Sequence, residues 1–128
     1  MNGVLLVDKS IGPTSHDVVA KVRRALGIRS IGHAGTLDPM ASGLLVLLVG
    51  EATKISDYLL NGDKAYEVVV RLGVRTDSMD MTGLILEEAP AETLSRLTEA
   101  EVQSAVMAMA GTLELQVPVH SAVKVNGK

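Results

Sequence analysis

The feature that most constrains the fold is a run of six consecutive apolar residues, LLVLLV, at positions 44–49. Neighbouring side chains of a β-strand point to opposite faces of its sheet. A run that is apolar at every position is therefore typical of a strand that is buried on both faces. We expect residues 44–49 to form a central strand of a covered sheet.

A glycine-rich segment comes directly before this run. Residues 32–43 read GHAGTLDPMASG, with three glycines, one histidine, one carboxylate and one proline. Ordinary connections between strands and helices are shorter and more polar. Because catalytic residues are often carried by loops that a rigid scaffold holds in place, the sequence predicts a functional loop with His33 and Asp38.

The composition indicates one soluble domain. The chain has 128 residues, of which 47% are hydrophobic, and its only aromatic residues are Tyr58 and Tyr66. The absence of cysteine excludes disulfides and thiolate metal sites. Since no signal peptide and no apolar run long enough to cross a membrane are visible, we expect a cytoplasmic protein without a membrane partner.

The charge is unevenly distributed along the chain. The formal net charge is −3, yet residues 18–37 contain no acid and four basic residues, and residues 77–128 contain eight acids and three bases. RNA binding requires a local basic surface rather than a basic protein. The four basic residues are therefore candidates for contacts with RNA, or else form a solvated helix face: Lys21, Arg23, Arg24 and Arg29.

Capping and periodicity predict an α+β fold with a mixed, mostly antiparallel sheet flanked by helices. A first helix begins at a capping box formed by Thr14 and Asp17 and ends at Gly27. A short helix is expected before Asn61. Another begins at a second capping box and ends at Gly111, and its apolar inner face consists of Val102, Ala105, Val106 and Met109. Further strands are expected at residues 4–7, 66–72, 84–87, 113–117 and 119–125.

The last residues suggest an incomplete sheet at the C-terminus. The dipeptide Asn126-Gly127 is a strong hairpin signal, but no second strand follows it. We therefore expect residues 1–128 to be a fragment of a longer domain, with an open sheet edge.

The pattern G-H-x-G-T-L-D-P-x-A-x-G at residues 32–43 resembles the catalytic motif of the bacterial tRNA pseudouridine synthases of the TruB type. Residues 3–15, 50–54, 64–66, 72–77 and 118–124 resemble further landmarks of that family in order and spacing. One departure is Ser10, where the family usually has proline. The resemblance implies a pseudouridine synthase-like fold, with residues 1–128 as the N-terminal part of the catalytic domain. The catalytic arginine and a small RNA-binding domain would then lie beyond Lys128.

This resemblance implies conversion of uridine-55 in the TΨC arm of tRNA to pseudouridine, without a metal or cofactor and with no obligate protein partner. Asp38 would be the essential aspartate. A carboxylate against the sugar can stabilise positive charge, attack C1′ or take a proton from C2′, and the sequence leaves these roles open. An isolated Asp-Pro pair would more often simply begin a turn.

The resemblance also implies residues that bind the substrate. The target base would be flipped out of the RNA and packed on Tyr66, although the alternation around Tyr66 fits a core residue equally well. His33 would contact RNA near the flipped base, and Gly32 and Gly35 would let the backbone approach the RNA closely. Thr36 is a further residue expected to bind the substrate. Two lysines would contact RNA or orient the catalytic loop, or else lie on the surface: Lys9 and Lys64.

Two other classes of function stay open from the sequence. One is an RNA-binding module without catalysis, since the family's later catalytic segments are not among these residues. The other is a metal-dependent hydrolase that uses His33, Asp38 and Asp77, although their spacing fits no common ligand pattern.

Overall fold

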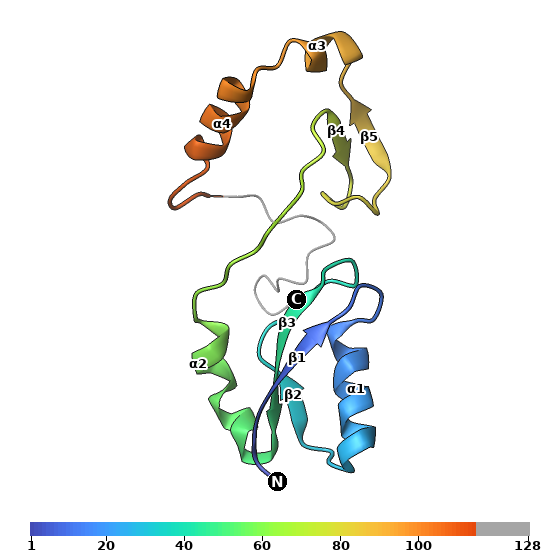
Figure 1. The fold of residues 1–128 in the computed structure, drawn as a ribbon, viewed down its shortest axis with the longest axis vertical. Helices are drawn as coiled ribbons and strands as arrows, with labels where there is room; N and C mark the ends of the chain where they lie inside the picture. The colour runs from blue at the N-terminus through green and yellow to red at the C-terminus, as the bar shows by residue number, and fades with distance from the viewer. Residues whose placement is uncertain (115–128) are drawn as a thin grey trace. The chain divides into compact units, whose positions relative to one another are not determined.

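The computed structural model describes residues 1–114. The chain divides into two compact units, Met1–Tyr66 and a second that begins at Glu67 (Figure 1). The strand expected at 119–125 and the turn at Asn126-Gly127 lie outside the described residues, as does most of the strand expected at 113–117.

The first unit contains a three-stranded antiparallel sheet. Its strands are β1 (Gly3–Lys9), β2 (Ile31–His33) and β3 (Gly43–Val49), in the order β1-β3-β2. β3 pairs with β1 along its whole length and with β2 at its C-terminal end. The apolar run is therefore the central strand, as the sequence predicted.

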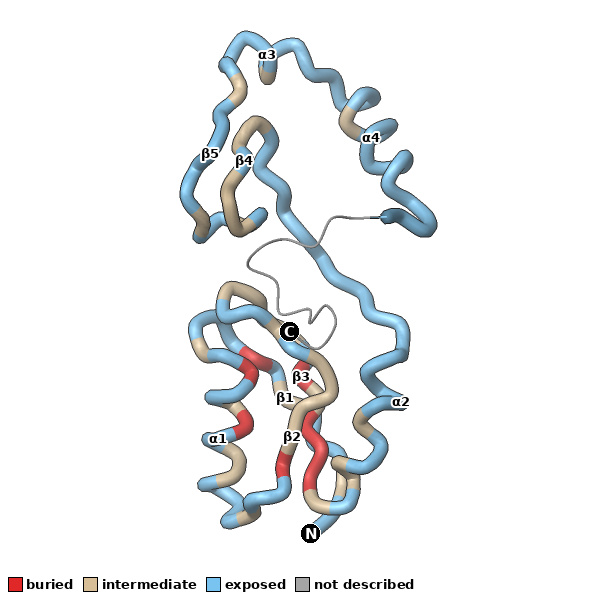
Figure 2. Tube along the Cα trace, turned by 180° about the vertical axis from the view of Figure 1, so that it is seen from behind, coloured by how far each residue is buried: buried red, intermediate tan, exposed pale blue. Residues whose placement is uncertain are grey.

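Helix α1 (Ser15–Leu26) covers one face of this sheet. Both halves of its predicted capping box are present, since Thr14 and Asp17 exchange side-chain and main-chain hydrogen bonds. Gly27 ends the helix with φ of 66°, the left-handed conformation that glycine adopts without strain. The buried core lies between helix and sheet (Figure 2) and consists of Val19, Ile31, Leu45, Leu47 and Val49.

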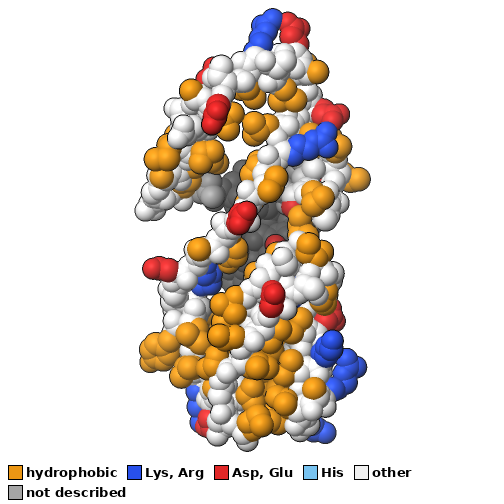
Figure 3. Space-filling model, viewed as in Figure 1, with side chains coloured by type: hydrophobic (Ala, Val, Ile, Leu, Met, Phe, Trp, Pro, Cys, Tyr) orange, Lys and Arg blue, Asp and Glu red, His pale blue; other side chains and the backbone are white. Residues whose placement is uncertain are grey.

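The opposite face of the sheet is only partly covered within residues 1–114. Leu48 is buried there, but Leu44 on the same face of β3 is 63% exposed. Val4 and Leu6 of β1 pair with residues of this face and are exposed as well. Figure 3 shows hydrophobic side chains gathered on the side of the first unit that carries β1. We expected a sheet covered on both faces. Among the described residues, the face that packs against α1 is covered, and the opposite face is covered only in part.

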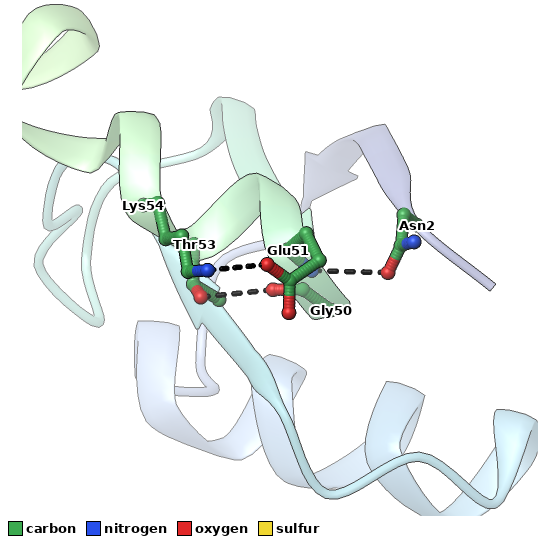
Figure 4. A network of polar contacts seen from close by, with 5 residues as sticks. All are labelled: Asn2, Gly50, Glu51, Thr53 and Lys54. Carbon is green, nitrogen blue, oxygen red and sulfur yellow. Dashed lines mark hydrogen bonds and ion pairs between the residues drawn. The ribbon is translucent and has the colours of Figure 1, made fainter.

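A 3-10 helix, η1 (Gly50–Ile55), and a short α-helix, α2 (Ser56–Leu60), follow β3, as the spacing predicted. Polar contacts join η1 to the start of β1, because the Asn2 side chain accepts a hydrogen bond of 3.0 Å from the Glu51 N–H (Figure 4). Gly50 has φ of 61°, and a Cβ there would lie 2.7 Å from the carbonyl oxygen of Met1. Only glycine fits this position without a shift of the N-terminal backbone.

The second unit pairs β4 (Val74–Thr76) with β5 (Ile85–Glu88) in an antiparallel ladder that has a register shift between Arg75 and Thr76. Arg75 and Glu87 lie opposite each other and form an exposed ion pair of 3.2 Å. Helices α3 (Ala91–Ser95) and α4 (Glu99–Ala108) follow, and α4 begins at the predicted capping box of Thr98 and Glu101.

Two predictions for this unit are wrong. Residues 66–72 form no strand. Their alternation of apolar and polar side chains is compatible with one face of a sheet, but a strand also needs a hydrogen-bonded neighbour. None of residues 1–114 pairs with this segment. The apolar positions of α4 are not buried either, because Val106 and Met109 are both exposed. Within residues 67–114 the structure buries no residue, so no packed core holds these elements there.

The described elements establish the predicted α+β class, with antiparallel sheets and separate helices. None of the helices in residues 1–114 combines the length and apolar character that a membrane span requires.

Candidate functional site

The loop between β2 and β3 carries four of the predicted site residues. His33 is the last residue of β2, and Gly35, Thr36 and Asp38 follow in the loop. The Ala34 N–H donates a hydrogen bond of 2.9 Å to the Val46 carbonyl, which extends the ladder by one step. The loop therefore leaves a rigid sheet edge directly before Gly35, whose φ of 118° turns the backbone.

Asp38 lies at an exposed turn of this loop. Its carbonyl accepts a hydrogen bond of 3.0 Å from the Ala41 N–H. Asp38 is exposed, and within the described residues its carboxylate takes part in no hydrogen bond or ion pair.

Two connections tie the residues that flank Asp38 to the first residue of α1 and to the segment before that helix. The Ser15 hydroxyl donates to the Leu37 carbonyl at 3.0 Å and accepts from the Leu37 N–H at 2.9 Å. The Gly12 N–H donates to the Pro39 carbonyl at 2.8 Å. The residue before Asp38 and the residue after it are therefore both held, and Leu37 also packs against the core.

Lys9 lies beneath this segment and not on the surface. It is 1% exposed, and its ammonium donates hydrogen bonds to the carbonyl oxygens of Ser10 (3.0 Å) and Pro13 (2.9 Å). A buried charge is tolerated only when polar groups surround it. These contacts hold the loop before α1, and the burial of Lys9 contradicts the alternative that it is a surface lysine.

The ring of His33 lies against helix α1. It packs edge-to-face against the ring of His16, with centroids 6.5 Å apart. Its Nδ1 is buried and has no hydrogen-bond partner among residues 1–114. A buried ring nitrogen without a partner costs free energy.

Lys64 and Tyr66 follow α2 and are not joined to the Asp38 loop by any hydrogen bond within residues 1–114. The Lys64 ammonium donates to the carbonyl oxygens of Leu60 (2.7 Å) and Gly62 (2.9 Å), which lie at the end of α2. Tyr66 is 66% exposed. The alternative that Tyr66 is a core residue is therefore wrong for the described part of the chain.

Electrostatics near the loop stabilise the start of α1. The hydroxyl of Thr14, followed by its main-chain N–H, holds the pKa of the Asp17 carboxyl below its ordinary value. Asp17 is therefore ionised at neutral pH, which suits a carboxylate at a helix N-terminus. This keeps fixed the helix end from which Ser15 reaches Leu37.

The structure describes no group of three or more His, Asp or Glu side chains that could hold a metal ion within residues 1–114. Asp77 and Asp80 bind their own loop instead, since Asp77 accepts the Leu84 N–H and Asp80 accepts the Thr82 N–H, each at 2.8 Å.

The sequence reasoning missed the roles of Ser15 and Gly12 in holding this loop. Ser15 contacts a residue 22 positions away, and local patterns say nothing about contacts of that range. One signal was present in the sequence, a glycine at position 12 directly before a capping box. The structure gives Gly12 a φ of 114°, a conformation that other residues rarely adopt.

Comparisons with known proteins agree on one family. The family model of the TruB family pseudouridylate synthase (N terminal domain) matches residues 23–128. A curated tRNA pseudouridine synthase B of Bdellovibrio bacteriovorus is 51% identical over 127 residues, which are 99% of this chain and 40% of the relative. The same-named protein of Opitutus terrae is 50% identical over 99% of this chain and 52% of its own length.

The chain thus spans about half, or less, of the length of these two curated relatives. One solved structure, of an H/ACA RNP bound to a substrate RNA containing 2'-deoxyuridine, contains a chain that is 46% identical to this one. That match covers 45% of this chain and 18% of the other, with a TM-score of 0.44. The family match covers most of the sequence, including the Asp38 loop. The chain belongs to the TruB family of pseudouridylate synthases.

Proposed function

We propose that this chain is the N-terminal part of the catalytic domain of an enzyme that isomerises uridine-55 in the TΨC arm of tRNA to pseudouridine. Its relatives are named tRNA pseudouridine synthase B, and the family model is that of a pseudouridylate synthase. The proposed reaction uses no metal and no cofactor. The proposed location is the cytoplasm, where tRNA is modified.

The reaction breaks the N1–C1′ bond of uridine and joins C5 of the same uracil to C1′. As the base leaves, C1′ becomes electron-poor, and a carboxylate beside the sugar stabilises that carbon or forms a bond to it. Asp38 is the residue proposed for this role. The exposed position of Asp38 on a tethered loop supports the assignment.

The target base must leave the folded RNA before Asp38 can reach its sugar. We assign Tyr66 to stacking on the flipped uracil, because it is an exposed aromatic and stacking of a base on an aromatic ring contributes about 1–3 kcal/mol. His33 is assigned to the RNA beside the vacated position, because it is the last residue of β2, directly before the loop that carries Asp38.

The remaining site residues are assigned by their contacts. Gly35 and Thr36 are proposed to meet the RNA backbone from the loop itself. Lys64 is proposed to meet a phosphate from the end of α2, and Lys9 to act through the loop that it holds.

The single observation that carries this proposal is the exposed carboxylate of Asp38 in a loop whose flanking residues are both fixed to the fold. Positioning of this kind supplies a large part of an enzyme's rate enhancement. A loop that merely turned between strands would not need two long-range anchors.

The test is an assay of pseudouridine formation with the natural full-length protein and a TΨC stem-loop. We expect conversion of the uridine at position 55 and none in a matched stem-loop that carries cytidine there. Exhaustive chelation should leave the rate unchanged, provided that the RNA stays folded. No pseudouridine in any tRNA, or activity that depends on added zinc, would contradict the proposal.

A second candidate is RNA binding without catalysis by residues 1–128 themselves. The same assay with residues 1–128 alone separates the two, because binding of the stem-loop without conversion supports the second candidate.

A further inference from the structure

The hydroxyl of Ser15 satisfies both main-chain polar groups of the residue before Asp38. It donates to the Leu37 carbonyl at 3.0 Å and accepts from the Leu37 N–H at 2.9 Å. Ser15 is 3% exposed, so water cannot easily replace it. A buried main-chain group that loses its hydrogen-bond partner costs free energy. Without the Ser15 hydroxyl, the N–H and C=O of Leu37 would therefore stay unpaired, or the loop would shift so that they find other partners.

Ser15 itself is held rigidly. It is the first residue of α1, next to the capping box of Thr14 and Asp17, and Val19 one turn later lies in the core. The segment before it is held by the ammonium of Lys9. The position of Leu37 is therefore fixed relative to the helix and the sheet.

The second anchor acts from the other side of Asp38. The Gly12 N–H donates to the Pro39 carbonyl at 2.8 Å, so the residues on both sides of Asp38 are bound to residues 12–15. These main-chain contacts fix the backbone from which the Asp38 side chain projects.

We propose that Ser15 is a positioning residue, which fixes the Asp38 loop through both main-chain groups of Leu37. This inference rests on the proposed function of Asp38. The family match begins at residue 23 and so does not include Ser15. A displacement of about 1 Å in a reacting group can lower the rate by about 10²-fold, so the loss of this anchor should affect turnover more than binding.

The experiment compares Ser15→Ala with Ser15→Thr in the natural full-length protein. Ser15→Ala removes the hydroxyl, and we expect kcat to fall by about tenfold or more while KM for the RNA changes less than about threefold. The amide exchange of Leu37 should become faster. Ser15→Thr keeps a hydroxyl and should restore most of the kcat and the slow exchange. The matched control is Ser95→Ala, which removes an exposed hydroxyl that binds Glu92 in α3 and should change neither quantity.

A Ser15→Ala protein that exchanges faster at Leu37 but keeps its kcat within about twofold would overturn the proposal. So would unchanged exchange at Leu37, a result that does not depend on activity. If the wild-type protein makes no pseudouridine, the proposed function fails, while the exchange data still test the anchor. If Ser15→Ala does not fold, Ser15→Cys replaces it, because a thiol is of similar size and forms weaker hydrogen bonds. Its kcat should fall as well, but to a smaller degree. A wild-type kcat in Ser15→Cys would contradict the proposal.

Discussion

At the residue scale, short polar side chains hold the loops of this chain in place. Asp80 lies in the loop between β4 and β5, where it accepts hydrogen bonds from the hydroxyls of Ser78 and Thr82, each at 2.7 Å. The Ser78 hydroxyl, followed by that of Thr82, lowers the pKa of Asp80 from 3.8 to about 2. The negative charge of Asp80 is therefore part of the loop's structure and need not belong to a metal site.

This gives a prediction for acid stability. Because the folded-state pKa of Asp80 is lowered, its ionised form stabilises the fold above its ordinary value of 3.8, and this contribution is lost as the pH falls toward about 2. Ser78→Ala removes the largest cause, so the pKa of Asp80 should rise toward 3.8. NMR titration of the Asp80 carboxyl carbon measures it, with Ser95→Ala as a control that should change nothing. A wild-type midpoint at 3.8 would contradict the account.

At the element scale, the sequence predicted those elements whose signals are local. The apolar run identified β3, and the two capping boxes identified the starts of α1 and α4. Residues 66–72 alternate like a strand but pair with nothing in the described chain, because pairing depends on residues distant in sequence. The contact of Ser15 with Leu37 could not be predicted for the same reason, whereas the loop that carries Asp38 could.

The basic residues around α1 also divide once their contacts are known. The guanidinium of Arg23 is partly buried and donates from Nε to the Ile31 carbonyl at 3.1 Å, so it serves the fold. Lys21, Arg24 and Arg29 are exposed and remain available for phosphates. The predicted group of four is therefore better described as three surface charges and one structural arginine.

We therefore predict that neutralising Lys21, Arg24 and Arg29 to glutamine weakens tRNA binding by the natural full-length protein. Each lost phosphate contact should lower the slope of log K against log salt by roughly one, which binding titrations at several salt concentrations measure. Arg23→Gln should mainly lower the melting temperature, since it breaks a contact between α1 and β2. An unchanged slope in the triple variant would mean that these residues form only a solvated face.

At the scale of the whole molecule, the buried residues among residues 1–114 all lie in the first unit. Its core of apolar residues between α1 and the sheet supports the loop that carries Asp38, whereas residues 67–114 contain no buried residue. The exposed apolar side chains on the β1 side of the sheet could not be predicted, because the run at 44–49 reads as buried on both faces. The buried contacts that support the Asp38 loop therefore belong to the first unit.

The most direct test of the central claim is Asp38→Asn in the natural full-length protein. The substitution keeps the size of the side chain and removes its charge, so tRNA binding should stay within about threefold of the wild type. Pseudouridine formation should fall by at least about 10²-fold, since even an acid–base role alone contributes about 10²–10⁴ in rate. Asp57→Asn, at an exposed carboxylate of α2, is the matched control and should keep full activity. An Asp38→Asn protein that retains more than about a tenth of wild-type turnover would contradict the claim that Asp38 carries the chemistry.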